Sequence, residues 1–323
     1  MTITRRSTVG AALAAVALPS ALIPSMARAA QPLATAQAPA FFRYRVGDLQ
    51  ATAINDGVYV RPSEGLVPNA PPGGLQQALA DRFLPTDKVT ISFTTLVVNT
   101  GSKLVLLDTG NGDLAAPTSG TWLANFRAAG FDPANVDAVV ISHFHGDHIN
   151  GLRMKDGTAR FPRAEIMVPA VEWAFWTDDA KMAQAPAGLK GTFDNTRRVF
   201  GPVANDVTRY EWGKEILPGI TAVDAHGHTP GHTAFAITSG TGRLLAMSDT
   251  TNDPNIFARN PEWSAVFDQD GPEAIKARRR MLDLAVAERM QVSFYHAPFP
   301  ATGFIAREGN GYALVPVTWR PEV

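Results

Sequence analysis

The seven histidines of this 323-residue chain fall in three short segments. Residues 143–148 read His-Phe-His-Gly-Asp-His, residues 226–232 read His-Gly-His-Thr-Pro-Gly-His, and His296 stands alone. Neutral imidazoles combined with carboxylates are the ligands that a zinc-like ion takes when water must fill its open position. Because the chain has no cysteine, thiolate ligands and a cysteine nucleophile are excluded. The histidine segments therefore predict a metal site built from nitrogen and oxygen ligands.

The spacing within the first segment suits two neighbouring ions. His143 and His145 are two residues apart, so in extended chain they project to the same side and can bind one ion. Gly146 then lets the chain turn, which can aim Asp147 and His148 at a second ion.

The elements expected around these segments place them at the ends of strands. Residues 136–141 form a largely apolar run before His143, which is typical of a strand buried on both faces. Strands are also expected just before Asp249 and His296. The other predicted elements are strands at 41–46, 49–54, 90–98, 104–108, 220–223 and 233–238, and helices at 121–129 and 272–290.

The N-terminal residues have the pattern of an export signal. Arg5 and Arg6 precede an Ala-rich apolar run, and Ala27-Arg28-Ala29 is a small-x-small cleavage site. The sequence thus predicts a signal peptide at 1–29, a flexible leader at 30–40 and a folded domain at 41–323. Paired arginines favour the twin-arginine route to the periplasm or the medium, with the general secretory route as the alternative.

The charge balance limits the expected partners. Removing residues 1–29 takes three of the 29 basic residues and none of the 30 acidic ones, which leaves a mature net charge of about −4. A mildly acidic chain is a poor match for nucleic acid or for an anionic membrane surface. We therefore expect a small-molecule substrate, no nucleic acid and no membrane, with a homodimer left open.

The order of the motifs resembles the metallo-β-lactamase superfamily. His-x-His-x-Asp-His at 143–148, Gly-His-Thr-Pro-Gly-His at 227–232, Asp249 and the late His296 follow the family's order, and Asp108 matches an aspartate after its early hairpin. Within the family the chain is most similar to the methyl parathion hydrolase branch, through residues 97–110, 226–233 and 307–312. The resemblance covers nearly the whole chain after the leader. It implies that residues 41–323 form a hydrolase domain with an α/β fold of four αββα layers, in which two mixed β-sheets lie between helices.

The resemblance also implies two divalent transition-metal ions, with zinc as the expected metal. The implied ligands form two sets: His143, His145 and His228 for one ion, Asp147, His148 and His296 for the other, and Asp249 bridging both. Asp147 and Asp249 would act catalytically with a metal-bridging hydroxide, because two ions about 3.5–4 Å apart lower the pKa of a shared water to about 7. The alternatives are polar histidines at strand ends, a helix-capping Asp147 and a loop aspartate at Asp249. Asp108, His226 and His232 are expected to support ligands rather than to bind metal.

The family hosts many activities, so the fold alone does not choose the substrate. The expected reaction is hydrolysis of lactones, aryl carboxylic esters or organophosphate triesters. A mononuclear iron persulfide dioxygenase, a β-lactamase-type member and a metal-binding protein without activity are the alternatives. Trp176 and Phe193 are the predicted pocket residues. Residues 111–116 lack the aromatic that the parathion-hydrolase branch has there, which predicts a reshaped aryl pocket less suited to organophosphates.

The paired arginines generate a test of the export route. Replacing Arg5 and Arg6 together by lysine should block export, because the twin-arginine machinery reads the arginine pair itself. The measurement is the amount of mature protein in the periplasm of cells that express the double variant or the wild type. Undiminished export of the variant would point to the general secretory route.

Overall fold

Runs of β-branched and apolar residues build two seven-stranded sheets within residues 38–323, in a computed structural model that describes residues 33–323. The predicted signal peptide and the first residues of the predicted leader lie outside the described residues. The first sheet has the strand order β1-β2-β3-β4-β5-β6-β7. Its strands are β1 Phe41–Val46, β2 Leu49–Pro62, β3 Lys88–Asn99, β4 Leu104–Leu107, β5 Ala138–Val140, β6 Glu165–Pro169 and β7 Thr208–Tyr210.

The second sheet has the order β14-β13-β12-β11-β10-β9-β8. Its strands are β8 Glu215–Leu217, β9 Ile220–Asp224, β10 Thr233–Ser239, β11 Gly242–Ala246, β12 Gln291–Ser293, β13 Thr302–Glu308 and β14 Gly311–Pro316. Both sheets are mixed: β4 to β7 pair in parallel in the first, and β11 pairs in parallel with β12 in the second. The remaining pairings are antiparallel.

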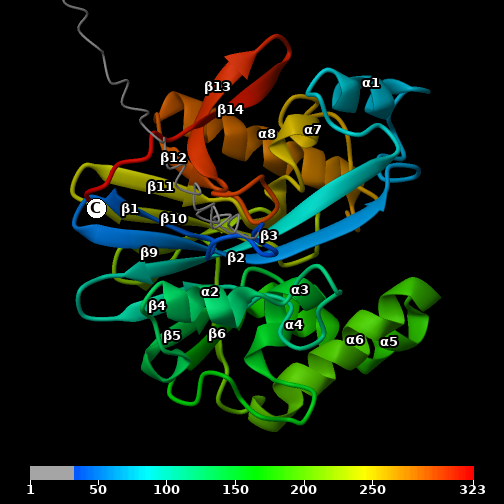
Figure 1. The fold of residues 1–323 in the computed structure, drawn as a ribbon. Coiled ribbons are helices and arrows are strands. Elements are labelled where there is room, and N and C mark those ends of the chain that lie inside the picture. The colour runs from blue at the N-terminus through cyan, green and yellow to red at the C-terminus, as the bar shows by residue number, and fades with distance from the viewer. Residues whose placement is uncertain (1–32) are drawn as a thin grey trace, which may run out of the picture. The chain divides into compact units, whose positions relative to one another are not determined.

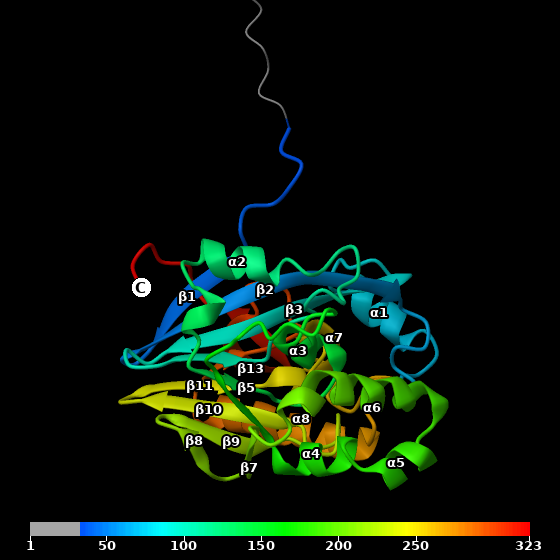
Figure 2. The same ribbon diagram turned by 90° about the horizontal axis from the view of Figure 1, so that it is seen from below.

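The two sheets pack face to face, and helices cover their outer faces (Figures 1 and 2). The core between the sheets includes Val105 and Val140 from the first sheet and Phe235 and Leu244 from the second. The α-helices of the described chain are α1 Gly74–Ala80, α2 Trp122–Ala128, α3 Gly146–Ile149, α4 Ala170–Trp176, α5 Asp179–Gln184, α6 Ala187–Phe200, α7 Pro254–Phe257 and α8 Gly271–Ala287. Helices α2, α4 and α6 pack on the first sheet, and α8 packs on the second. The predicted αββα fold is thus confirmed.

The predicted metal-binding segments all follow strands that end at one edge of the sheets. Strand β5 leads into 143–148 and the β9–β10 connection holds 226–232, while Asp249 and His296 follow β11 and β12. Because β11 and β12 are parallel neighbours, their carboxyl ends lie side by side. The Thr233 amide donates to the carbonyl of Ser142 at 3.1 Å, which joins the two sheets at this edge.

Among the helices of residues 33–323, none combines the length and the apolar composition that crossing a membrane requires.

The opposite edge contains a close backbone contact between the sheets, and this contact can be tested. A Cβ atom on Gly242, in β11, would lie 2.0 Å from the backbone nitrogen of Gly47, in the β1–β2 turn. Gly242→Ala should therefore push the sheets apart and lower the free energy of unfolding by about 1–3 kcal/mol, as measured by urea denaturation.

Gly191 is the matched control, because it lies in α6 and an added Cβ would meet nothing within 4 Å. Gly191→Ala should leave the free energy of unfolding unchanged or raise it by up to about 1 kcal/mol. Equal stability of the Gly242→Ala variant and the wild type would show that the sheets can separate there at no cost.

Candidate metal centre

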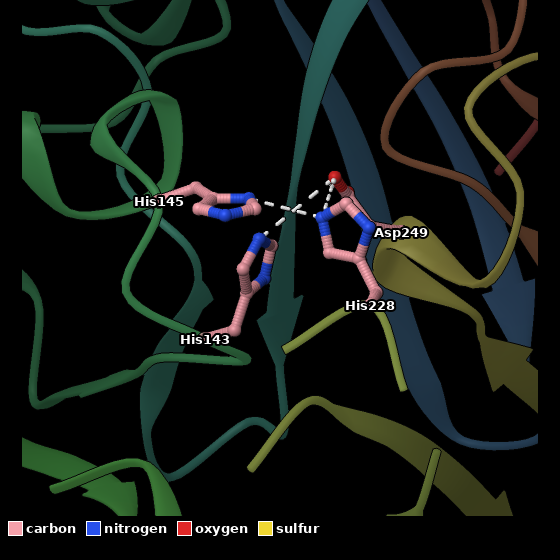
Figure 3. Close-up of side chains that lie close together, drawn as sticks. All are labelled: His143, His145, His228 and Asp249. Atoms are coloured by element: carbon pink, nitrogen blue, oxygen red, sulfur yellow. Dashed lines mark hydrogen bonds and ion pairs between the residues drawn. The ribbon is translucent and has the colours of Figure 1, made fainter. Parts of the chain in front are cut away.

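The structure brings all seven predicted metal ligands together in two adjoining groups. The first group is His143, His145, His228 and Asp249, each offering a nitrogen or oxygen atom within 4.8 Å of the others. Figure 3 shows their side chains pointing toward one another, with His143 and His145 on one loop and His228 and Asp249 on two others. The second group is Asp147, His148 and His296, which meet the same distance criterion.

Asp249 lies between the two groups. In the first group its Oδ2 is 3.2 Å from His228 Nε2 and 3.8 Å from His143 Nε2. In the second, its Oδ1 is 3.2 Å from His148 Nε2 and its Oδ2 is 3.0 Å from His296 Nε2. A single buried carboxylate therefore reaches both groups, which is the geometry that a bridging ligand requires.

Several atoms of the centre lack the partner that burial normally demands. His143 Nε2, His148 Nε2 and Asp249 Oδ1 are buried and make no well-aligned hydrogen bond in the described structure, although the last two atoms lie 3.2 Å apart. A buried polar atom without a partner costs roughly 1–3 kcal/mol, so such atoms call for an explanation. All three point into the two groups, and nitrogen and oxygen donors of this kind suit a zinc-like divalent ion. The residues present therefore fit a cation in each group.

Hydrogen bonds from outside the centre aim three of the imidazoles. Each histidine donates its Nδ1 proton to an oxygen at 2.8 Å: His148 to Asp108, His228 to Asp268 and His296 to the carbonyl of Ser92. Donation from Nδ1 leaves Nε2 as the ring nitrogen that faces the centre, and Nε2 is the atom that can bind a cation once it carries no proton.

The expected supporting role of Asp108 agrees with these contacts. Its carboxylate also accepts from the backbone and hydroxyl of Ser142, and its φ of 59° is strained for a residue other than glycine. Asp268, in contrast, was not singled out by the sequence. It lies in an irregular segment after α7, far in the chain from His228, and no local motif marks it.

The two other histidines of the second segment have different surroundings. His232 is buried, donates from Nδ1 to the carbonyl of Ala225 and accepts from the backbone nitrogen of Asp249 at 3.0 Å. Burial lowers the pKa of His232 to about 4, so it stays neutral and holds Asp249 in place. His226 is 41% exposed, pairs with Asp224 and belongs to neither group.

The charges within the centre compensate one another. Burial lowers the pKa of His228, but the carboxylates of Asp249 and Asp268 outweigh burial and raise it to about 9. Burial also lowers the pKa of His145, to about 3, with protonated His228 acting in the same direction. Consistently, His228 Nε2 lies 3.0 Å from His145 Nδ1, as a donor and its acceptor. A cation that enters must displace the proton of His228, so acid opposes metal binding.

A cavity of about 780 Å³ opens above the centre. His145, Asp147, His228, Asp249 and His296 line one part of it. Its apolar wall consists of Tyr59, Ile91, Phe93, Leu114, Ala116, Pro186, Leu189, Val266 and Phe267. Among the described residues that line the cavity, none is a lysine or an arginine.

The aromatic wall differs from the expected one. Trp176 and Phe193 do not line the cavity, because both are fully buried and pack against each other in the core under α4 and α6. The cavity's aromatic side chains are Tyr59 and Phe93, from strands β2 and β3, and Phe267. Alternating strand patterns show which residues share a face, but they do not show which strand end borders a cavity.

A buried carboxylate holds the loop that carries residues 111–116. Asp56, at 0% exposure, accepts from the backbone nitrogens of Asn111 and Trp122, both at 2.7 Å. Leu114 and Ala116 of this loop line the cavity. Asp56, in strand β2, therefore fixes the position of the loop that forms one wall of the cavity.

Both the sequence and the fold are similar to those of known proteins. The family model of the metallo-beta-lactamase superfamily matches residues 87–291. No curated protein sequence matches the chain.

Among solved structures, AidC, a dizinc quorum-quenching lactonase in complex with the product N-hexanoyl-L-homoserine, is 25% identical, with a TM-score of 0.82 over 87% of this chain and 98% of that one. The hydrolase AbOPH of the beta lactamase superfamily is 26% identical, with a TM-score of 0.83 over 88% and 100%. A probable metal-dependent hydrolase from Staphylococcus aureus, at 20% identity and a TM-score of 0.68 over 85% and 100%, shares the fold.

The position of Asp249 predicts its effect on metal content. Elemental analysis of wild-type protein purified without chelator should find close to two transition-metal ions per chain. Asp249→Ala and Asp249→Asn should both lower that number, because each removes the charged carboxylate that reaches both groups.

Asp253→Asn is the matched control. Asp253 is also a buried aspartate but belongs to neither group, and asparagine can keep its cap on α7. This variant should retain both ions. A wild-type content of one iron per chain, or full occupancy in the Asp249 variants, would contradict the bridging role.

Proposed function

Because this chain belongs to the metallo-beta-lactamase superfamily and is a metal-dependent hydrolase, we propose that it is a binuclear enzyme that opens lactones and cleaves aryl carboxylic esters. The observation that carries the proposal is the Asp249 carboxylate, which reaches both ligand groups beside a cavity with an apolar wall. AidC supports the lactone assignment, since it is a dizinc lactonase at 25% identity over most of both chains.

The two ligand groups would each hold one of the ions that the proposed reaction needs. Two bound divalent ions would activate a water molecule and polarise the carbonyl oxygen of the substrate. His143, His145 and His228 would hold one ion, His148 and His296 with Asp147 the other, and Asp249 would join them. Asp147 is 22% exposed and faces the cavity, so its carboxylate is placed to hold a proton beside the scissile bond.

The charge of the cavity favours a neutral substrate. Apart from the centre itself, its lining offers apolar side chains, the carboxylate of Asp268 and the amide or hydroxyl groups of Asn111, Ser119, Thr192, Asn252 and Gln269. Without a lysine or arginine among the described lining residues, nothing there pairs with an anionic substituent. This argues for a lactone or an ester over a carboxylate-bearing β-lactam or an anionic persulfide.

The apolar wall accounts for how such a substrate would be held. Burying apolar surface contributes about 25 cal/mol per Å², so an acyl chain or aryl group laid along Ile91, Phe93 and Leu189 gains binding energy without a specific polar contact. The carbonyl carbon would then face the centre. Combined with the export signal expected at residues 1–29, this describes an enzyme that acts on neutral compounds in the periplasm or outside the cell.

A substrate panel on metal-replete protein tests the proposal. The panel contains N-hexanoyl homoserine lactone, phenyl acetate, an aryl phosphotriester, a chromogenic cephalosporin and glutathione persulfide, with oxygen consumption recorded for the last. The lactone and the aryl ester should give the highest specificity constants, because they are neutral, unlike the cephalosporin and the persulfide, and because the loop at 111–116 offers the phosphotriester no aromatic contact. The Asp249→Ala variant serves as the control that ties turnover to this centre.

Other outcomes have definite meanings. Highest activity on the phosphotriester would show that Tyr59, Phe93 and Phe267 form an efficient aryl site. Turnover of the persulfide with oxygen uptake would replace the hydrolytic proposal, and absence of turnover with both ions bound would indicate a metal-binding protein.

A further inference from the structure

Glu172 is a fully buried acid that the proposed reaction does not use. It lies in the first turn of α4 and accepts four hydrogen bonds. Its Oε1 accepts from the backbone nitrogen of Phe144 at 3.0 Å and from the indole of Trp176 at 2.7 Å. Its Oε2 accepts from the hydroxyl of Thr229 at 2.9 Å and from the backbone nitrogen of Gly231 at 2.7 Å.

The two oxygens hold different histidine segments. Phe144 stands between His143 and His145 in the first segment. Thr229 follows His228 in the second segment, and Gly231 follows two residues later. One carboxylate thus joins two loops that come from different sheets and carry the three histidines of the first ligand group.

The contact is too close to admit another side chain. A Cβ atom on Gly231 would lie 2.3 Å from the backbone nitrogen of Glu172, so the Pro230-Gly231 turn packs directly on the start of α4. This contact explains why a glycine is required in the His-Thr-Pro-Gly-His sequence. It also fixes the distance between the turn and the Glu172 carboxylate.

We propose that Glu172 is a positioning residue that holds the two histidine segments in register for metal binding. The inference rests on the proposed function only in that it takes these histidines to bind metal. All four partners are hydrogen-bond donors, and an ionised carboxylate is an acceptor at both oxygens. A glutamine of the same shape would instead turn its NH₂ group toward the donors of one segment, and that segment would lose its anchor.

The experiment compares Glu172→Gln with the wild type in two measurements that need no substrate. The first is the Kd for zinc, by competition with a chromophoric chelator, and the second is the visible absorption spectrum of the cobalt(II)-substituted protein. Glu172→Gln should weaken zinc binding by about 10–100-fold, the range typical of groups that orient metal ligands. Its cobalt spectrum should also differ from that of the wild type, because the geometry of the imidazoles changes.

Two further variants make the result decisive. Thr229→Val removes one donor to Oε2 and should weaken zinc binding by a smaller factor, which keeps the test available if Glu172→Gln does not fold. Val199→Ala removes buried volume from the core that α4 and α6 share, and no hydrogen bond joins Val199 to either histidine segment in the described structure. It should lower the Tm and leave the Kd and the spectrum unchanged.

If Glu172→Gln keeps the Kd for zinc and the cobalt spectrum of the wild type, the positioning role is wrong. It is also wrong if Val199→Ala loses as much zinc affinity as Glu172→Gln does. The wild-type enzyme's turnover of the lactone is measured separately. Failure of the proposed hydrolysis is therefore distinguishable from failure of this inference.

Discussion

The structure depends on the burial of one carboxylate among four imidazoles. Asp249 lies 3.0–3.8 Å from nitrogens of His143, His148, His228 and His296, and almost all of this cluster is shielded from water. Buried polar groups are costly unless partners surround them, so such a cluster persists only where the fold supplies those partners. The face-to-face packing of two sheets does so, since each sheet contributes part of the cluster from the same edge.

A ring of hydrogen bonds outside the cluster gives it direction. Asp108, Asp268 and the carbonyl of Ser92 each accept an Nδ1 proton, and His232 accepts from the Asp249 backbone. The side chains of Asp108 and Asp268 are almost completely buried and Ser92 lies in strand β3, so the Nε2 atoms point inward before any ion is bound. Preorganisation of this kind lowers the entropy that metal binding would otherwise cost.

The cavity decides what such a centre can act on. The metal-dependent hydrolase assignment follows from the family, but members of one fold differ in substrate because their walls differ. Here the walls come from strands β2 and β3, from α6 and from the loops at 111–119 and 266–269, and they are mostly apolar and without cationic side chains. A neutral ester or lactone matches that chemistry better than an anionic substrate.

The sequence by itself determined the donor types, the motif order and the strands that precede them, because metal-ligand spacing and apolar runs are local properties. Most predicted strands and both predicted helices agree with the structure within a few residues, although β2 extends to Pro62 and strands β6, β7, β8, β13 and β14 were not predicted. Only the tertiary structure revealed Glu172, Asp268 and Asp56, since each acts on a segment distant in the chain through a single side chain. The tertiary structure also showed that Tyr59, Phe93 and Phe267 line the cavity, whereas Trp176 is buried in the core. Whether a side chain faces a cavity depends on how the sheets and helices pack, and local periodicity does not show it.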